Sequence, residues 1–342
     1  MTNNLVSIII PVFNAENFLD ETIKSVLNQT LKEIEIILVN DGSCDNSLII
    51  CQKYANLDFR IKLISQKNSG VSIARNNGLS EANGDYIYFL DSDDTIDENF
   101  INTSYQRAIE SNSDIVVLGE YYCKRSPNIT ALPTCALFLN HKFLLKNSTI
   151  RFPKKIQPCE DGLFSHQLLA LTQKVSLNFE CEYYYRQHEN QNHHTINKET
   201  NKVINQIPKW LEILENFYVK NELNQTKALH LALFLEHEPF EFRYLNMPLN
   251  IDQKVFLHKL IKEFYFKNIS ENITKKEVKS LSKPFLKFIK KDSAEKFDKY
   301  YNSYLRRIKL KNKILRKLIN FIPISKFRKK LKLIIDSVYN KN

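Results

Sequence analysis

The sequence lacks any hydrophobic run long enough to cross a membrane. No apolar stretch reaches 18 residues, so no transmembrane helix is predicted, and the polar start at residues 1–4 does not resemble a signal peptide. The six cysteines show no C-x-x-C spacing, which argues against a zinc or redox motif. We therefore expect a cytoplasmic protein whose thiols stay reduced.

Glycine is scarce and is confined to the first half of the chain, since all six glycines lie at or before Gly162. The excess of positive over negative charge is confined to the opposite end of the chain. Residues 301–342 contain 13 Lys and Arg against a single acid, whereas the rest of the chain contains 36 against 37 acids. The formal net charge of +11 therefore belongs to the tail. We expect three parts: residues 1–198, 199–300 and 301–342.

Buried strands and amphipathic helices alternate over the first 118 residues. Strands are expected at 6–14, 35–40, 60–65, 86–90 and 114–118. A helix is expected after each of the first four strands: at 15–29, from after residue 43 to about residue 55, at 71–81 and at 98–111. This order predicts an α/β fold with a doubly wound, mainly parallel, Rossmann-like sheet. A further strand is expected at 175–186, a loop at 188–198, and a mostly α-helical C-terminal region beyond 199.

The strand at 86–90 ends in three carboxylates, Asp91, Asp93 and Asp94. Carboxylates this close repel one another unless a divalent metal, a basic ligand or solvent takes up the charge. The carboxyl ends of the strands are also where open α/β sheets bind ligands. A plainer alternative is an acidic turn that caps the next helix, with Asp94 or Thr95 as the N-cap.

Five motifs resemble, in the same order, those of the family 2 glycosyltransferases. They are S-I-I-I-P-V-F-N (7–14), V-N-D-G-S (39–43), N-S-G-V-S-I-A-R-N-N-G-L (68–79), G-D-Y-I-Y-F-L-D-S-D-D (84–94) and C-E-D-G (159–162). The resemblance implies a GT-A fold and an inverting transfer of sugar from a nucleotide-sugar donor, UDP-linked, to a saccharide or glycolipid acceptor. The resemblance is in particular to bacterial capsule and lipooligosaccharide transferases.

The resemblance also implies roles on the donor side. Asp93 would bind a divalent metal, Mn²⁺ or Mg²⁺, and Asp91 would face the metal or the ribose. Arg75 would pair with the diphosphate, although an arginine on a helix is more often a surface residue. The remaining donor-binding positions are Pro11, Phe13, Asn14, Asp41 and Ser92. Asp41 would hydrogen-bond the uracil ring. Its alternative role is to close a turn before Gly42.

On the acceptor side, the resemblance places the catalytic base on Asp161, with Glu160 orienting the acceptor. An acceptor hydroxyl is a poor nucleophile until a base takes its proton. The alternative is that both carboxylates only favour the N-terminus of a helix. Some GT-A enzymes use a histidine from a downstream loop as a further metal ligand, and His193 or His194 would serve here. The alternative is that His188, His193 and His194 are ordinary surface histidines.

The basic tail predicts an amphipathic helix over 304–322, with a basic stripe that includes Arg306 and Lys313 and an apolar side that includes Leu305 and Ile308. Such a helix is typical of an interfacial anchor, so an anionic membrane surface is the expected partner of residues 301–342, at the inner face of the cytoplasmic membrane. The alternatives are packing on the protein itself or binding of nucleic acid. No nucleic acid is expected, because no nucleic-acid-binding motif accompanies the charge.

Two other functions stay open from the sequence. One is a related transferase that acts on teichoic acid or on protein. The other is a catalytically silent GT-A protein that binds the nucleotide-sugar as a partner in an assembly complex. Donor-dependent turnover distinguishes that binding protein from an enzyme.

Overall fold

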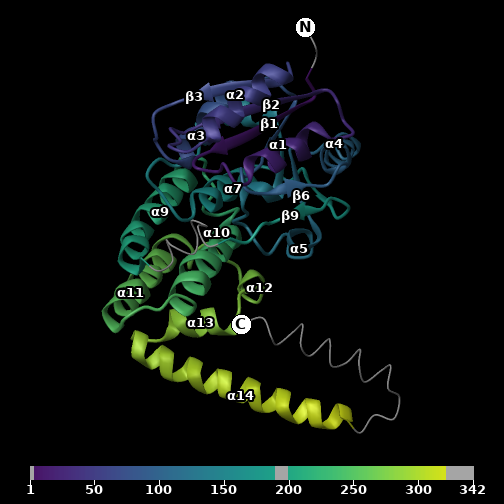
Figure 1. Ribbon diagram of the computed structural model, residues 1–342. Helices are drawn as coiled ribbons and strands as arrows, with labels where there is room; N and C mark the ends of the chain where they lie inside the picture. Colours follow the sequence, from purple (N-terminus) through teal and green to yellow (C-terminus); the bar gives the residue numbers. More distant parts are fainter. Residues whose placement is uncertain (1–3, 189–198, 321–342) are drawn as a thin grey trace.

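The structure is a computed structural model and describes residues 4–188 and 199–320. Figure 1 shows an α/β region, formed by the first half of the chain, next to a group of helices formed by the second half. The long helix α14 (Ala294–Asn320) runs across the far end of these helices, remote from the sheet.

The described residues form a central sheet of seven strands in the order β3-β2-β1-β4-β7-β6-β8. Its strands are β1 (Val6–Val12), β2 (Ile34–Asn40), β3 (Ile61–Ser65), β4 (Tyr86–Phe89), β6 (Ile115–Leu118), β7 (Leu137–Asn140) and β8 (Val175–Asn178). β3, β2, β1 and β4 are parallel, β7 is antiparallel to both of its neighbours, and β6 is parallel to β8. The mixed but mainly parallel sheet confirms the predicted fold class.

Apolar residues cover both faces of this sheet. In β1, Ile9 belongs to one buried cluster, whereas Ile8 and Ile10 belong to the other, because successive side chains point to opposite faces. The helices of this region are α1 (Leu19–Leu27), α2 (Ser47–Leu57), α3 (Val71–Ser80), α4 (Phe100–Glu110), α5 (Glu120–Cys123), α6 (His141–Lys146) and α7 (Glu160–Leu171). Double coverage explains why the strands are apolar runs without alternation.

Several elements of the structure differ from those expected. The strand expected at 175–186 is divided into β8 and β9 (Tyr183–Tyr184), and β9 pairs with β5 (Thr95–Ile96) in a separate two-stranded sheet. β7 was missed, because no strand was expected between residues 118 and 175. It has only four residues and is placed by pairing with β4 and β6, which are distant in sequence.

The helical C-terminal region is confirmed. It comprises α9 (Thr200–Lys220), α10 (Ala228–Leu235), the π-helix η2 (Glu236–Leu245), α11 (Ile251–Asn268), α12 (Lys275–Val278), α13 (Lys283–Lys290) and α14. The buried cluster that contains Ile9 continues into these helices through Trp210 and Phe240, so that the sheet and helices share one core.

The helix that carries the tail begins at Ala294, earlier than the expected start at Tyr304. Phe297 is fully buried, and Tyr301 packs against the core. Further along, Leu310 and Ile314 are exposed by 59% and 50%. Packing on the protein itself, one of the alternatives for the tail, thus holds for the start of α14. Residues 321–342, including Pro323, lie outside the described residues.

Within residues 4–188 and 199–320, no helix combines the length and the apolar character that crossing a bilayer requires.

Candidate functional site

Carboxylates from two distant segments meet at one buried arginine. Arg75, on α3, is 4% exposed. Its Nη2 lies 2.9 Å from Oδ1 of Asp91, and its Nη1 lies 2.6 Å from Oδ1 of Asp161 and 3.9 Å from Oε1 of Glu160. The sequence motifs around 91 and 161 therefore form one site at the carboxyl end of β4.

The loop that leads into α3 holds Arg75 in place. Asp41 follows β2, and its carboxylate accepts the backbone N–H groups of Ser69 and Gly70, each at 2.8 Å, and the side-chain amide of Gln66 at 2.7 Å. Gly70 precedes the helix with a φ of 90°, a conformation that favours glycine. Asp41 thus closes this loop. Asp41 accepts three hydrogen bonds within the protein, and a carboxylate accepts up to about four. One more can therefore be accepted, and the hydrogen bond to a uracil ring stays a prediction.

The other predicted base-pocket residues lie at the same rim. Pro11 is buried within β1 and pairs with Val39, whereas Phe13, directly after the strand, is 48% exposed. Asn14 has a φ of 49°, and its Oδ1 accepts the backbone N–H of Cys44 at 2.8 Å, which ties the loops after β1 and β2 together. Phe13 is therefore the exposed apolar surface available to a base at this edge.

Asp93 faces His188, which the sequence analysis named but did not propose as the metal ligand. His188 Nε2 lies 2.9 Å from Oδ2 of Asp93, and the His188 ring stacks on Phe18 at 4.5 Å between centroids. The pairing of β5 with β9 brings His188 back to this point, a contact between distant segments that no local pattern reveals. His193 and His194, the expected candidates, lie outside the described residues.

Asp94 has a structural role, and the helix-cap alternative is wrong. Its side chain is buried and accepts the hydroxyl of Tyr183 and the backbone N–H of Arg186. Helix α4 instead begins at Phe100, after Asn99, and has no side-chain cap. Burial raises the pKa of Asp94 to about 7. This carboxylate fastens β9 and the segment that follows it, which leads to His188, to the end of β4.

The residues present fit a divalent cation shared with a ligand. In the part of the chain that the structure describes, no three His, Cys, Asp or Glu side chains form a cluster able to hold a metal ion alone. Mg²⁺ is usually bound by one or two carboxylates together with substrate phosphates, and Mn²⁺ also suits oxygen ligands. Asp91 and Asp93 match that pattern. Ser92 lies between them, and its carbonyl accepts the Thr22 hydroxyl at 3.0 Å, which fixes the turn.

Glu160 and Asp161 occupy the first turn of α7, as expected. Asp161 Oδ2 faces the backbone N–H and the hydroxyl of Thr134, both at 3.4 Å, in the short 3₁₀ helix η1 (Thr134–Ala136). Burial raises the pKa of Asp161, and Arg75 opposes this shift. Burial raises the pKa of Glu160 to about 8, so Glu160 keeps its proton at neutral pH. One turn thus presents an ion-paired carboxylate and a neutral carboxyl.

Comparison with known proteins agrees with this geometry. Residues 7–169 match the family model described as Glycosyl transferase family 2. A cholesterol galactosyltransferase of Borreliella burgdorferi is 51% identical over 111 residues, 32% of this chain and 31% of that protein. The poly(ribitol-phosphate) beta-N-acetylglucosaminyltransferase TarP of Staphylococcus aureus is 29% identical over 264 residues, 68% of this chain and 80% of TarP.

The match extends to the three-dimensional fold. The crystal structure of S. aureus TarS residues 1–349 in complex with UDP-GlcNAc superposes with a TM-score of 0.69 at 21% identity, over 88% of this chain and 91% of that one. Coverage of curated relatives is smaller, since the chain spans between 17% and 40% of the length of three of them. Residues 7–169 of the chain therefore form a glycosyl transferase family 2 domain with a GT-A fold.

Proposed function

We propose that this protein is an inverting, metal-dependent glycosyltransferase that moves a sugar from a UDP-sugar to an acceptor in cell-surface polysaccharide or lipooligosaccharide assembly. The observation that carries the proposal is the position of Arg75 between Asp91 and Asp161, at 2.9 and 2.6 Å. One guanidinium thereby fixes the spacing between the donor-side carboxylates and the candidate base.

On the donor side, Asp91 and Asp93 would hold the divalent cation, and His188, 2.9 Å from Asp93, is positioned to join them. When bound, the cation would neutralise the negative charge that develops on the departing diphosphate. Phe13, Asn14 and Asp41 line the rim where the base binds. Both Nη atoms of Arg75 pair with carboxylates, whereas its buried Nε has no hydrogen-bond partner among the described residues. A contact of either Nη with the diphosphate therefore requires exchange of a carboxylate.

On the acceptor side, Asp161 takes the proton of the acceptor hydroxyl. The hydroxyl oxygen then bonds to the anomeric carbon from the face opposite the nucleotide, while the bond from that carbon to the diphosphate oxygen breaks and the nucleotide diphosphate leaves with the electron pair. Burial raises the pKa of Asp161, which strengthens it as a proton acceptor, while the ion pair with Arg75 opposes this shift and favours the charged form. Glu160, which is protonated, donates a hydrogen bond that orients the acceptor.

The acceptor has two candidates. A saccharide or glycolipid is the first, and the match to a cholesterol galactosyltransferase supports a lipid-bound acceptor. A teichoic acid is the second, and the match to TarP, which covers 68% of this chain, supports it. The name of TarP and the UDP-GlcNAc complex of TarS support a UDP-linked donor, with N-acetylglucosamine the first to test.

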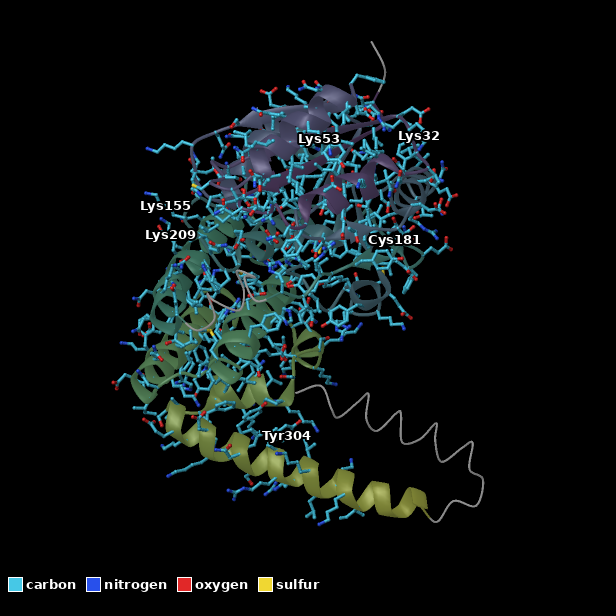
Figure 2. The ribbon with its side chains drawn as sticks, viewed as in Figure 1. Lys32, Lys53, Lys155, Cys181, Lys209 and Tyr304 are labelled. Carbon is cyan, nitrogen blue, oxygen red and sulfur yellow. The ribbon has the colours of Figure 1, made fainter. Side chains whose placement is uncertain are left out.

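The domain division that we propose assigns transfer to residues 1–198, support to the helical region 199–300, and membrane attachment to 301–342. Beyond Tyr304, which Figure 2 labels on α14, exposed Leu310 and Ile314 alternate with basic residues such as Lys313. Each basic residue near an anionic leaflet contributes about 1 kcal/mol, so this segment would attach the enzyme reversibly to the inner face of the cytoplasmic membrane.

A panel of UDP-, GDP- and CMP-sugars tests the proposal. Thermal stability and nucleotide release are measured with each sugar, with and without Mn²⁺, because a bound ligand raises stability by mass action. We expect a metal-dependent stabilisation by one UDP-sugar together with slow release of UDP. Folded protein that responds to no donor would contradict the proposal and favour the catalytically silent alternative.

A further inference from the structure

A buried ion pair in the helical region lies against the turn that carries the site carboxylates. Glu238 and Arg243, both in η2, are each 7% exposed, and Arg243 Nη2 lies 3.2 Å from Oε2 of Glu238. The two residues are five apart. In an α-helix that spacing turns side chains away from each other, whereas the wider turn of the π-helix brings them to one face.

The pair is connected to both neighbouring elements. Burial raises the pKa of the Cys159 thiol, immediately before α7, and the nearby Glu238 carboxylate adds to that shift. A methyl group built on Gly162 would lie 3.8 Å from Oε1 of Glu238 and 3.1 Å from the Cys159 sulfur, which shows how closely the turn and the carboxylate pack. On the other side, the Arg243 guanidinium lies over the ring of Trp210, a fully buried residue of α9, at 5.5 Å.

The turn held in this way has an unfavourable backbone. Cys159 has a φ of 83°, in the left-handed region that residues with a side chain rarely adopt. Such conformations persist only where the surroundings enforce them, and they gather at functional sites. The next two residues are Glu160 and Asp161, so the conformation at Cys159 sets the direction in which both carboxyl groups leave the helix.

We propose that Glu238 and Arg243 are positioning residues for the transfer reaction. They hold Cys159 in its left-handed conformation and thereby aim Glu160 and Asp161 at the acceptor. The inference rests on the proposed function, since it takes Asp161 as the base. It makes the helical region part of the catalytic unit, beyond its contribution to folding. Burying the Glu238 carboxylate beside Cys159 costs desolvation free energy. The ion pair with buried Arg243 offsets part of this cost.

The test uses the full-length variants Glu238→Gln and Arg243→Met and the double variant that combines them. Turnover, the KM for the donor, UDP affinity and melting temperature are measured for each. We expect Glu238→Gln to lower kcat by about 10-fold or more while the donor KM and UDP affinity stay within about 2-fold, because the donor side is untouched. Asp298→Asn is the control, since Asp298 pairs with Lys254 at 2.7 Å in the same region.

The double variant separates positioning from mere stability. Removing one member of a buried pair costs more stability than removing both, because the remaining charge loses a partner. We expect the double variant to regain thermal stability over the single variants without regaining kcat. Recovery of kcat together with stability, or a loss of kcat no larger than in Asp298→Asn, would overturn the inference. Full turnover in Asp161→Asn would instead reject Asp161 as the base, which is a separate failure.

Discussion

Arg75 and Asp161 form an ion pair across the site, with Nη1 of the guanidinium 2.6 Å from Oδ1 of the carboxylate. The same guanidinium reaches Asp91 at 2.9 Å. Because the Arg75 side chain is 5% exposed, its charge is compensated mainly by these carboxylates. The arginine expected to contact the diphosphate is thus also the residue that joins the two halves of the site.

Arg75→Met should therefore affect both stability and activity. Removing one partner from a buried ion pair costs about 3 kcal/mol or more, because the remaining charges are left uncompensated. We expect a lower melting temperature and loss of turnover. Arg75→Lys is the comparison, since a lysine is a point charge that cannot bridge two carboxylates in the same plane. It should fold better than the Met variant and still transfer sugar slowly. Normal turnover in Arg75→Met would contradict a role at the site.

Asp161→Asn should leave the donor side intact. The amide keeps the shape of the carboxylate but cannot take the acceptor proton, so we expect turnover to fall by about 10²-fold or more. UDP affinity and its metal dependence should not change, as measured by calorimetry. Asp114→Asn serves as the control. Asp114 accepts a hydrogen bond from the Thr172 hydroxyl at the amino end of β6, which is the end away from the site. A variant at 161 with ordinary turnover would remove this residue as the base.

Much of the fold was predictable because it follows from local patterns. The strands ending near Asn14, Asp41 and Asp91 are apolar runs followed by turn residues, and parallel crossovers bring their ends to one rim. The position of Asp161 in the first turn of a helix was also correct. These features depend on neighbours in sequence, so one sequence suffices to find them.

The parts that were missed depend on contacts between distant segments. The bond of Asp94 to Tyr183 replaces the helix cap that its local sequence favours. His188 reaches Asp93 only because β9 pairs with β5. The carboxylate pairing of Arg75 likewise needs α3 and α7 to be packed against each other. Local propensity carries no information on these pairings, and tertiary packing overrides it.

His188→Gln should weaken metal use without abolishing it. Asp91 and Asp93 remain as oxygen ligands, but the imidazole that lies 2.9 Å from Asp93 is lost. Removing such a neighbour of a metal site typically costs about 10–100-fold in metal affinity or activity. We expect a higher Mn²⁺ concentration at half-maximal turnover, with turnover at saturating metal much less affected. His141→Gln is the control, because His141 bonds a carbonyl at the far end of the sheet. An unchanged metal titration would exclude His188.

Truncation after Tyr304 should separate membrane attachment from folding. Tyr301 and Tyr304 stack on each other, and Phe297 and Tyr301 pack at the start of α14, so this end point keeps the aromatic contacts that a cut at 301 would remove. We expect the truncated protein to keep its melting temperature and its transfer to a soluble acceptor. Co-sedimentation with vesicles containing anionic lipid should be lost. Sedimentation equal to that of the full chain would place the anchor elsewhere.

Glu160→Gln should change how stability depends on pH. Burial raises the pKa of Glu160 to about 8, whereas an unfolded chain titrates this group near 4.5. Between these values the unfolded state loses the proton and the folded state keeps it, so the wild-type protein loses stability as pH rises from about 4.5 to about 8.

Glutamine cannot ionise, and the variant is free of this loss. Its melting temperature relative to wild type should rise from about pH 5 to about pH 8 and level off above, with the exposed Glu271→Gln variant parallel to wild type throughout. Parallel curves for Glu160→Gln and wild type would mean that Glu160 is already ionised at neutral pH. It would then be unable to donate the hydrogen bond that we assign to it in orienting the acceptor.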